Sequence, residues 1–99
     1  MVAELIMAPE AEQDLDEAYA WYEKQRAGLG GDFLDRVDAC LNAICRTPLA
    51  HQVVHADFRR TMVRRFPYAI YYEFADAKVI VYGIVHTSKD PDKWRQRLS

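Results

Sequence analysis

The sequence predicts an α+β fold in which a pair of helices covers one face of an antiparallel β-sheet. Apolar residues recur at helical spacing in the first half of the chain, whereas β-branched and aromatic residues dominate the second half. The expected order is β-α-α-β-β-β, followed by a short C-terminal helical turn. A chain of 99 residues fits one domain, which we expect to span residues 1–99.

The first half contains a short strand and two helices. The strand comprises residues 2–7, and a helix follows from Pro9, because proline is tolerated in the first helical turn. Gly28 and the Gly30–Gly31 pair are expected to end this helix and to start the next, which Thr47–Pro48 stops. Each helix carries an apolar stripe, made of Ala11, Leu15, Ala18 and Tyr22 in the first and of Phe33, Val37, Cys40, Leu41 and Ile44 in the second.

The second half is expected to form three consecutive antiparallel strands, residues 59–65, 68–75 and 78–86. Ala75-Asp76-Ala77 suits a tight turn, and residues 49–57 are expected to be a loop. The last strand is apolar on both faces, since Val79, Val81 and Val85 alternate with Ile80, Tyr82 and Ile84. Because the helical hairpin covers only one face, we expect the other face to be partly bare and to meet a partner.

Charge is divided unevenly along the chain. Residues 1–50 contain ten acidic and four basic side chains, whereas residues 51–99 contain five acidic and nine basic ones. The overall net charge of −2 is not typical of a nucleic-acid-binding domain, so we expect no sequence-specific nucleic-acid binding. The acidic run from Glu10 to Glu17 is interpreted as a solvated helix face.

A cluster of arginines at one end of the predicted meander is the strongest candidate for a binding surface. A positive patch on a rigid sheet can contact phosphate or an acidic protein surface. Aromatic residues on the first helix and in the middle strand extend this candidate surface. Its residues are Arg59, Arg60, Arg64, Arg65, Tyr71, Trp21 and Tyr19.

The remaining features predict no cofactor and no metal site. His51 and His55 are four residues apart, but they lie in a predicted loop without a third ligand. Asp90–Pro91 predicts the start of the last helical turn, in which Trp94 and Leu98 are interpreted as pinning the C-terminus onto the sheet. No membrane span or signal peptide is recognisable, so we expect a cytoplasmic protein.

Three segments in this order, DLDEAYAWYEKQRAGLGGDFLDRV, RRTMVRRFPYAIYYEF and VYGIVHTSKDPDKWRQRL, resemble the RelE/ParE superfamily of toxins from type II toxin–antitoxin modules. The chain is most similar to the ParE-like branch, whose members are often called plasmid stabilisation proteins. The resemblance implies a compact toxin in a hetero-oligomer with a small, ParD-like antitoxin that wraps across it. ParE-type toxins are associated with inhibition of DNA gyrase, and RelE-type toxins with cleavage of mRNA on the ribosome.

The two activities require different chemistry. Ribonuclease action needs an acid, a base and cations, and the resemblance implies His86 and either Arg64 or Arg65 as the corresponding positions, with Arg65 as the expected cation. Against cleavage, the chain lacks a broad basic surface, and His86 also suits a strand-end histidine hydrogen-bonded to Asp90 or to a backbone carbonyl. We therefore expect no catalytic residues and a toxin that inhibits gyrase by binding. A ribosome-dependent endoribonuclease is the alternative, and a module that only sequesters its antitoxin is a third reading.

Overall fold

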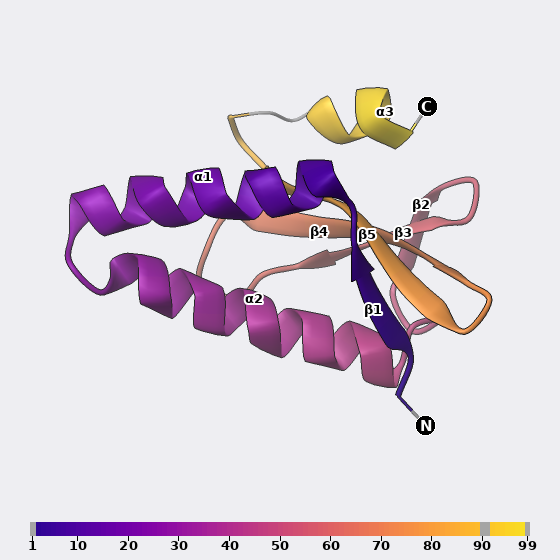
Figure 1. Cartoon of the computed structure of the whole chain (residues 1–99). Helices are drawn as coiled ribbons and strands as arrows, with labels where there is room; N and C mark the ends of the chain where they lie inside the picture. The colour runs from indigo at the N-terminus through magenta and orange to yellow at the C-terminus, as the bar shows by residue number, and fades with distance from the viewer. Residues whose placement is uncertain (1, 90–91, 99) are drawn as a thin grey trace.

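A computed structural model describes residues 2–89 and 92–98 of the chain (Figure 1). The elements follow one another as β1 (Glu4–Met7), α1 (Pro9–Gln25), α2 (Leu29–Arg46), β2 (Gln52–His55), β3 (Phe58–Met62), β4 (Tyr68–Ala75), β5 (Lys78–His86) and α3 (Lys93–Leu98).

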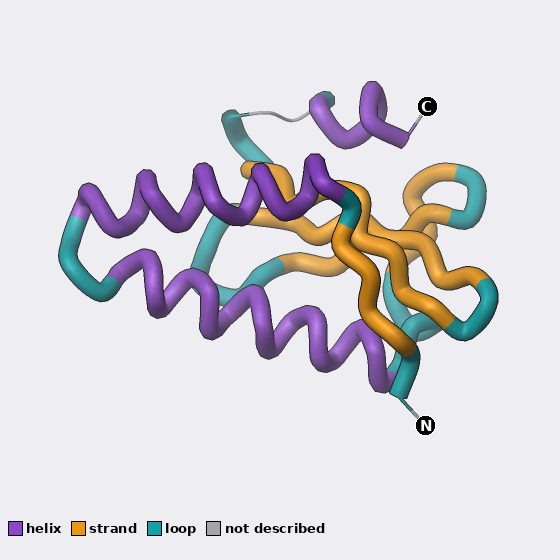
Figure 2. Tube along the Cα trace, in the orientation of Figure 1, coloured by secondary structure: helices purple, strands orange, loops and turns teal. Residues whose placement is uncertain are grey.

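The strands form one sheet in the order β1-β5-β4-β3-β2, in which β1 runs parallel to β5 and all other neighbours are antiparallel. Figure 2 shows α1 and α2 as an antiparallel hairpin on one side of this sheet, with α3 apart from them. The predicted α+β fold, with a meander covered by a helical hairpin, is therefore confirmed. Within the described residues, no helix has the length and apolar character of a membrane span.

Two sequence predictions about the strands were wrong. Residues 49–57 were expected to be a loop, but they contain β2, a four-residue edge strand that pairs with β3. The strand expected at residues 59–65 ends at Met62, because Arg65 adopts a φ of +71° and the chain turns between β3 and β4. By contrast, β4 and β5 have the expected bounds, and Asp76 and Ala77 both adopt positive φ in the tight turn between them.

The link between α1 and α2 depends on Gly28, whose φ of +89° lies in the region that glycine tolerates best. Gly30 and Gly31 lie in the first turn of α2, consistent with the expectation that these glycines separate the two helices. The Glu23 carboxylate accepts hydrogen bonds from the Gly28 and Gly30 N–H groups, both at 3.0 Å, and so holds the end of α1 to the start of α2. A Cβ atom at Gly30 would lie 2.7 Å from the Tyr19 ring, so glycine lets this ring pack against α2.

The main core lies between the helical hairpin and the sheet. The apolar stripes of α1 and α2 meet the inward-facing residues of β4 and β5, and the largest side chains buried there include Phe33, Ile44, Ile70 and Tyr72. The Tyr72 hydroxyl donates a 2.6 Å hydrogen bond to the Pro48 carbonyl. Burial raises the pKa of Tyr72 to about 12, so this phenol stays neutral where it meets the core.

A bulge at Tyr82 changes which side chains near the end of β5 point to each face of the sheet. Tyr71 pairs with Gly83 but Tyr72 pairs with Val81, which leaves Tyr82 as an extra residue in β5. Val81 and Ile84 both face the hairpin as a result, whereas Val85 packs on the opposite face. The expectation that Val79, Val81 and Val85 share one face was therefore wrong at Val85.

The opposite face of the sheet is covered in part by α3. Leu98 is buried there with Ala69 and Val85, and the Trp94 ring stacks on Tyr71 with centroids 5.2 Å apart. The interpretation of Trp94 and Leu98 as residues that pin the C-terminus to the sheet is confirmed. The predicted helix start at residues 90–91 lies outside the described residues.

Asp14 connects the helical hairpin, the bulge and α3. It was interpreted as part of a solvated helix face, but only 7% of it is exposed. Its carboxylate accepts a 3.0 Å hydrogen bond from the Ile84 N–H and a bidentate interaction from Arg97, and Lys93 lies 3.5 Å away. Arg97 reaches Asp14 by passing over Gly83, where a Cβ atom would lie 3.1 Å from a guanidinium nitrogen.

Candidate functional site

The loop between β3 and β4, residues 63–67, carries Arg64 and Arg65 and is anchored by side-chain packing and a backbone hydrogen bond. The Phe66 ring packs between the two helices, with its centroid 4.9 Å from that of Tyr22 and 5.2 Å from that of Phe33. At the end of the loop, the Pro67 carbonyl accepts a 2.8 Å hydrogen bond from the Thr87 N–H. Both arginines are exposed, so the loop offers two positive charges to solvent on a packed support.

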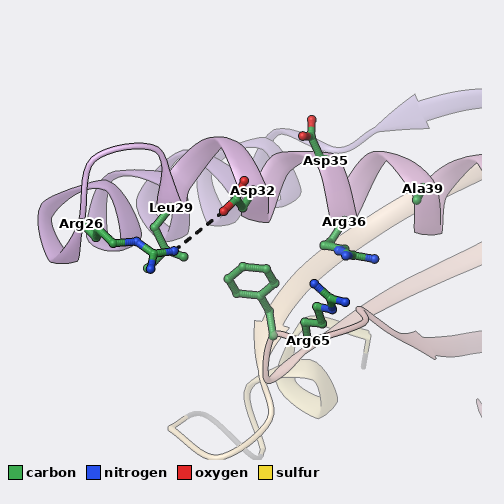
Figure 3. Close-up of a pocket in the computed structure, with 8 residues that line it drawn as sticks. Arg26, Leu29, Asp32, Asp35, Arg36, Ala39 and Arg65 are labelled. Atoms are coloured by element: carbon green, nitrogen blue, oxygen red, sulfur yellow. Dashed lines mark ion pairs between the residues drawn. The ribbon is translucent and has the colours of Figure 1, made fainter.

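Arg65 faces α2 across a hollow of about 460 Å³, the arginine hollow, shown in Figure 3. The Arg36 guanidinium extends from α2 towards Arg65, while Asp35 points away from it. Arg26 is 3.9 Å from Asp32, and both side chains are largely exposed, so this ion pair contributes little to stability. The arginine hollow is lined by Arg26, Leu29, Asp32, Asp35, Arg36, Ala39, Arg65 and Phe66.

A second hollow of about 330 Å³, the methionine hollow, continues along α2 and shares Arg36 and Ala39 with the first. It contains Arg64 and the side chain of Met62, which is 51% exposed. Its other lining residues are Cys40, Ala43 and Thr61. Three arginines from α2 and the β3–β4 loop therefore border these two hollows.

Arg59 and Arg60 do not join these arginines, so the single cluster expected from the sequence is divided. Neighbouring residues of a strand point to opposite faces, and Arg59 and Arg60 pair with Tyr72 and Tyr71 respectively. Arg59 donates to the carbonyls of Leu49 and His51, the latter at 2.7 Å, and so fastens the segment before β2. Arg60 donates to the Gln52 side chain at 3.1 Å.

His86 lies in a different hollow, of about 170 Å³, between the end of β5 and α1. Its Nδ1 atom accepts hydrogen bonds from the backbone N–H groups of Ser88 and Lys89, at 3.0 and 2.8 Å. The ring also packs edge-on against Tyr68, with centroids 5.1 Å apart. The histidine hollow is lined by Asp14, Glu17, Ala18, Trp21, Tyr68, Ile84, Val85, His86, Lys89 and Lys93.

Arg65 and His86, which would have to act together in a ribonuclease, line different hollows. Phe66 lines the arginine hollow and Tyr68 lines the histidine hollow, and both rings contact Tyr22. A packed aromatic cluster thus separates the two positions. Among the described residues, His86 accepts from backbone N–H groups, whereas the sequence reading expected a bond to a carbonyl or to Asp90, which lies outside the described residues.

The aromatic candidates occupy three different settings. Tyr71 is only 4% exposed, because Trp94 covers it. Tyr19 and Trp21 are 36% and 46% exposed; the Tyr19 ring lies beside Gly30 of α2, and the Lys89 ammonium is 4.3 Å from the centre of the Trp21 ring. In the free chain, Tyr19 and Trp21 are therefore accessible to a partner, and Tyr71 is accessible only if α3 moves.

The two histidines of the β2 region have aromatic neighbours. The His55 ring stacks on Phe58, and the His51 ring meets Tyr72 edge-on. Across residues 2–89 and 92–98, no three side chains of His, Cys, Asp or Glu gather closely enough to hold a metal ion.

Sequence reasoning did not single out Arg36, the residue common to both arginine-bordered hollows. A signal was present in the helix pattern. The stripe of Phe33, Val37 and Leu41 faces the core, so Arg36, Ala39 and Ala43 must lie on a different side of α2. The two hollows form on that side because the β3–β4 loop brings Arg64 and Arg65 beside these α2 residues.

Comparison with known proteins relates both the sequence and the fold to a family. A family model described as the ParE toxin of the type II toxin–antitoxin system parDE matches residues 5–91. The fold is similar to that of a chain from the chromosomal ParDE system of P. aeruginosa, with a TM-score of 0.76 and 12% identity over 86% of this chain and 96% of that chain. It is also similar to a mutant of the E. coli toxin RelE in the free state, with a TM-score of 0.72 and 14% identity over 99% of this chain and 96% of that chain.

At these identities the solved structures establish the fold alone, and no match was found among curated proteins. The family model covers most of the sequence. The chain therefore belongs to the ParE toxin family of type II toxin–antitoxin systems.

Proposed function

We propose that this ParE-type toxin acts by binding DNA gyrase and that a ParD-like antitoxin neutralises it by covering its binding surface. The resemblance to ParE-like toxins supports gyrase as the target. The exposed arginines of the β3–β4 loop and the exposed aromatic residues of α1 support action through a protein interface. Arginine and aromatic side chains are enriched in such interfaces.

The observation that carries this proposal is the separation of Arg65 from His86. Phosphodiester cleavage needs its cation and its proton-transfer group around one phosphate. Arg65 lines the arginine hollow, whereas His86 lies in the histidine hollow beyond a packed aromatic cluster. Its Nδ1 atom is already engaged by two backbone N–H groups. Inhibition by binding a protein does not require these two residues to lie close together.

The endoribonuclease alternative is favoured by one feature of the histidine hollow. Lys89 and Lys93 line it together with His86, so a proton-transfer group and two cations border one small space. Against it, Glu17 and the buried Asp14 line the same space, and they would repel a phosphate. Lys93 is also 3.5 Å from the Asp14 carboxylate.

Replacing His86 by glutamine separates the two activities. A positioned acid or base typically contributes about 10²–10⁴-fold to a reaction, so an endoribonuclease would lose nearly all activity. A binding toxin would lose only a contact worth about 1 kcal/mol. We expect expression of His86→Gln without antitoxin to arrest growth almost as strongly as expression of the parent chain. Mapping the ends of cellular mRNAs should show no difference between the two.

The matched control is His55→Gln, which changes an exposed histidine on β2 outside the histidine hollow. Codon-specific mRNA cuts that are present with the parent chain and absent with His86→Gln would replace the proposal by the endoribonuclease. Normal growth with the parent chain, expressed as a folded protein without antitoxin, would instead support a module that only sequesters its antitoxin.

A further inference from the structure

Strand β1 forms one edge of the sheet, and apolar side chains are exposed along it. It pairs with β5 alone. Val2 is 66% exposed, Leu5 41% and Ile6 38%. Three of the eight large apolar side chains that are exposed in the described part of the chain therefore lie in this four-residue strand or next to it. Contiguous apolar surface on a small domain indicates a partner.

The backbone of β1 also has unused hydrogen-bonding groups. The N–H groups of Glu4 and Ala8 donate to carbonyls of β5, at 3.3 and 2.9 Å. Because alternate residues of a strand direct these groups to opposite sides, those of Leu5 and Met7 point away from β5. Among the described residues, no strand lies on that side of β1. A further strand can therefore pair there.

The two edges of the sheet differ in how well they are protected against such pairing. Edge strands of soluble proteins usually carry lysine, proline or a bulge. The β1 strand has none of these, and its charged residue, Glu4, is paired with Lys78 of β5 in an unbroken register. At the other edge, β2 has a bulge between Val53 and His55. The β1 edge is therefore the better suited to a partner strand.

The two ends of β1 lie next to opposite charges, because β1 lies between the end of α2 and the start of α1 (Figure 1). At its start, the Ala3 N–H donates to the Cys45 carbonyl at 3.0 Å, and the next residue of α2 is the exposed Arg46. At its end, α1 begins with the exposed Glu10 and Glu12. Within the described part of the chain, these three side chains have no ion pair.

This charge arrangement is self-complementary and so favours a second copy of the chain as the partner. Antiparallel pairing of two β1 strands brings the start of each strand to the end of the other. Arg46 of each copy would then approach Glu10 and Glu12 of the second copy, which attracts the two chains and fixes their direction.

The side chains of β1 also favour one register for this pairing. When Ile6 lies opposite Ile6 of the second copy, Leu5 lies opposite Met7, and the outward backbone groups of these two residues face each other. Apolar side chains then meet apolar side chains across the two strands. Glu4 lies opposite Ala8 in this register, so no like charges are directly opposed.

We propose that two copies of this chain associate through antiparallel pairing of their β1 strands, so that one sheet runs through both copies. The association goes beyond the proposed function, because neither gyrase binding nor neutralisation requires it. Self-association of the purified toxin is measured without gyrase, so the two proposals can fail separately.

Sedimentation equilibrium of the purified toxin measures the Kd of self-association. We expect a dimer with a Kd of about 1–100 μM, since paired edge strands with flanking ion pairs make a small interface. Hydrogen exchange at the Leu5 and Met7 amides should slow as protein concentration rises, because only the dimer protects them. The dimer should weaken at about 0.5 M salt, which screens the attraction between Arg46 and the glutamates.

The sharpest variants change Ile6, which is partly exposed. Ile6→Lys places two like charges directly opposite each other and should weaken self-association at least about tenfold, and Ile6→Glu should do the same. An equimolar mixture of these two variants should form a dimer again, because lysine then faces glutamate. The matched control is Val53→Lys, which adds the same charge at an exposed apolar position of β2 and should keep the Kd within about twofold of the parent.

Four outcomes would overturn the proposal. The first is a toxin that stays monomeric up to about 1 mM. The second is equal weakening by Ile6→Lys and Val53→Lys, which would move the interface away from β1. The third is a mixture of the two Ile6 variants that stays monomeric. The fourth is protection of the Leu5 and Met7 amides only after antitoxin is added, which would assign the edge to an antitoxin strand.

Discussion

Replacing Asp14 by alanine is expected to lower the free energy of unfolding by about 3 kcal/mol, because removing one partner of a buried ion pair leaves the other uncompensated. Asp14 is 7% exposed, and its carboxylate accepts from Arg97 and from the Ile84 N–H. β1 pairs with β5 only as far as Val81, so it offers the Ile84 N–H no backbone acceptor in place of Asp14. Urea unfolding followed by circular dichroism measures the change.

In thermal unfolding the same loss corresponds to a Tm lower by about 12–24 °C for a domain of this size. Hydrogen exchange should also show that the amides of α3 lose protection first, since Asp14 ties this helix to α1. Asp16→Ala, an exposed position on the same helix, should stay within about 0.5 kcal/mol of the parent. Equal stability of the two variants would contradict the assigned role of Asp14.

Phe33→Ala is expected to cost about 3–5 kcal/mol, the usual range for deleting a buried phenyl ring. Phe33 is completely buried, and its ring lies 5.1–5.2 Å from those of Tyr22, Phe66 and Tyr68. Because Phe66 is the anchor of the β3–β4 loop, Arg65 should also lose its fixed position. Urea unfolding measures the first effect, and hydrogen exchange of the amides in residues 63–67 measures the second.

Phe33→Leu is the matched control, since it keeps most of the apolar volume and loses the ring contacts. Swaps of this kind usually cost less than about 1.5 kcal/mol. Phe33→Ala that is as stable as Phe33→Leu would contradict the cost assigned to deleting this buried side chain.

Periodicity was sufficient to predict the helical hairpin, β4 and β5, because each is long enough to show a repeating pattern. It could not reveal β2, a four-residue edge strand whose pairing with β3 is a tertiary contact. Nor could it reveal the bulge at Tyr82, which reverses the alternation near the end of β5. In the sequence, nothing distinguishes Asp14 from the acidic residues beside it. Its burial depends on its contact with Arg97 of α3, which is distant in the chain.

The candidate site was predicted less completely than the fold. Four arginines close together in the sequence suggested one patch, but the alternation of β3 sends Arg59 and Arg60 to opposite faces. Arg64 and Arg65 instead join Arg36, which is 28 residues before Arg64 in the chain. A contact between a helix and a loop so far apart in sequence leaves no local pattern to detect.

The most direct test of action by binding is a supercoiling assay with purified toxin, DNA gyrase, ATP and relaxed plasmid, in the absence of ribosomes. We expect inhibition that rises with toxin concentration, is nearly as strong with His86→Gln, and is reversed by the antitoxin. Unimpaired supercoiling at a large excess of folded toxin, from a preparation that stops growth when expressed in cells, would contradict gyrase as the target.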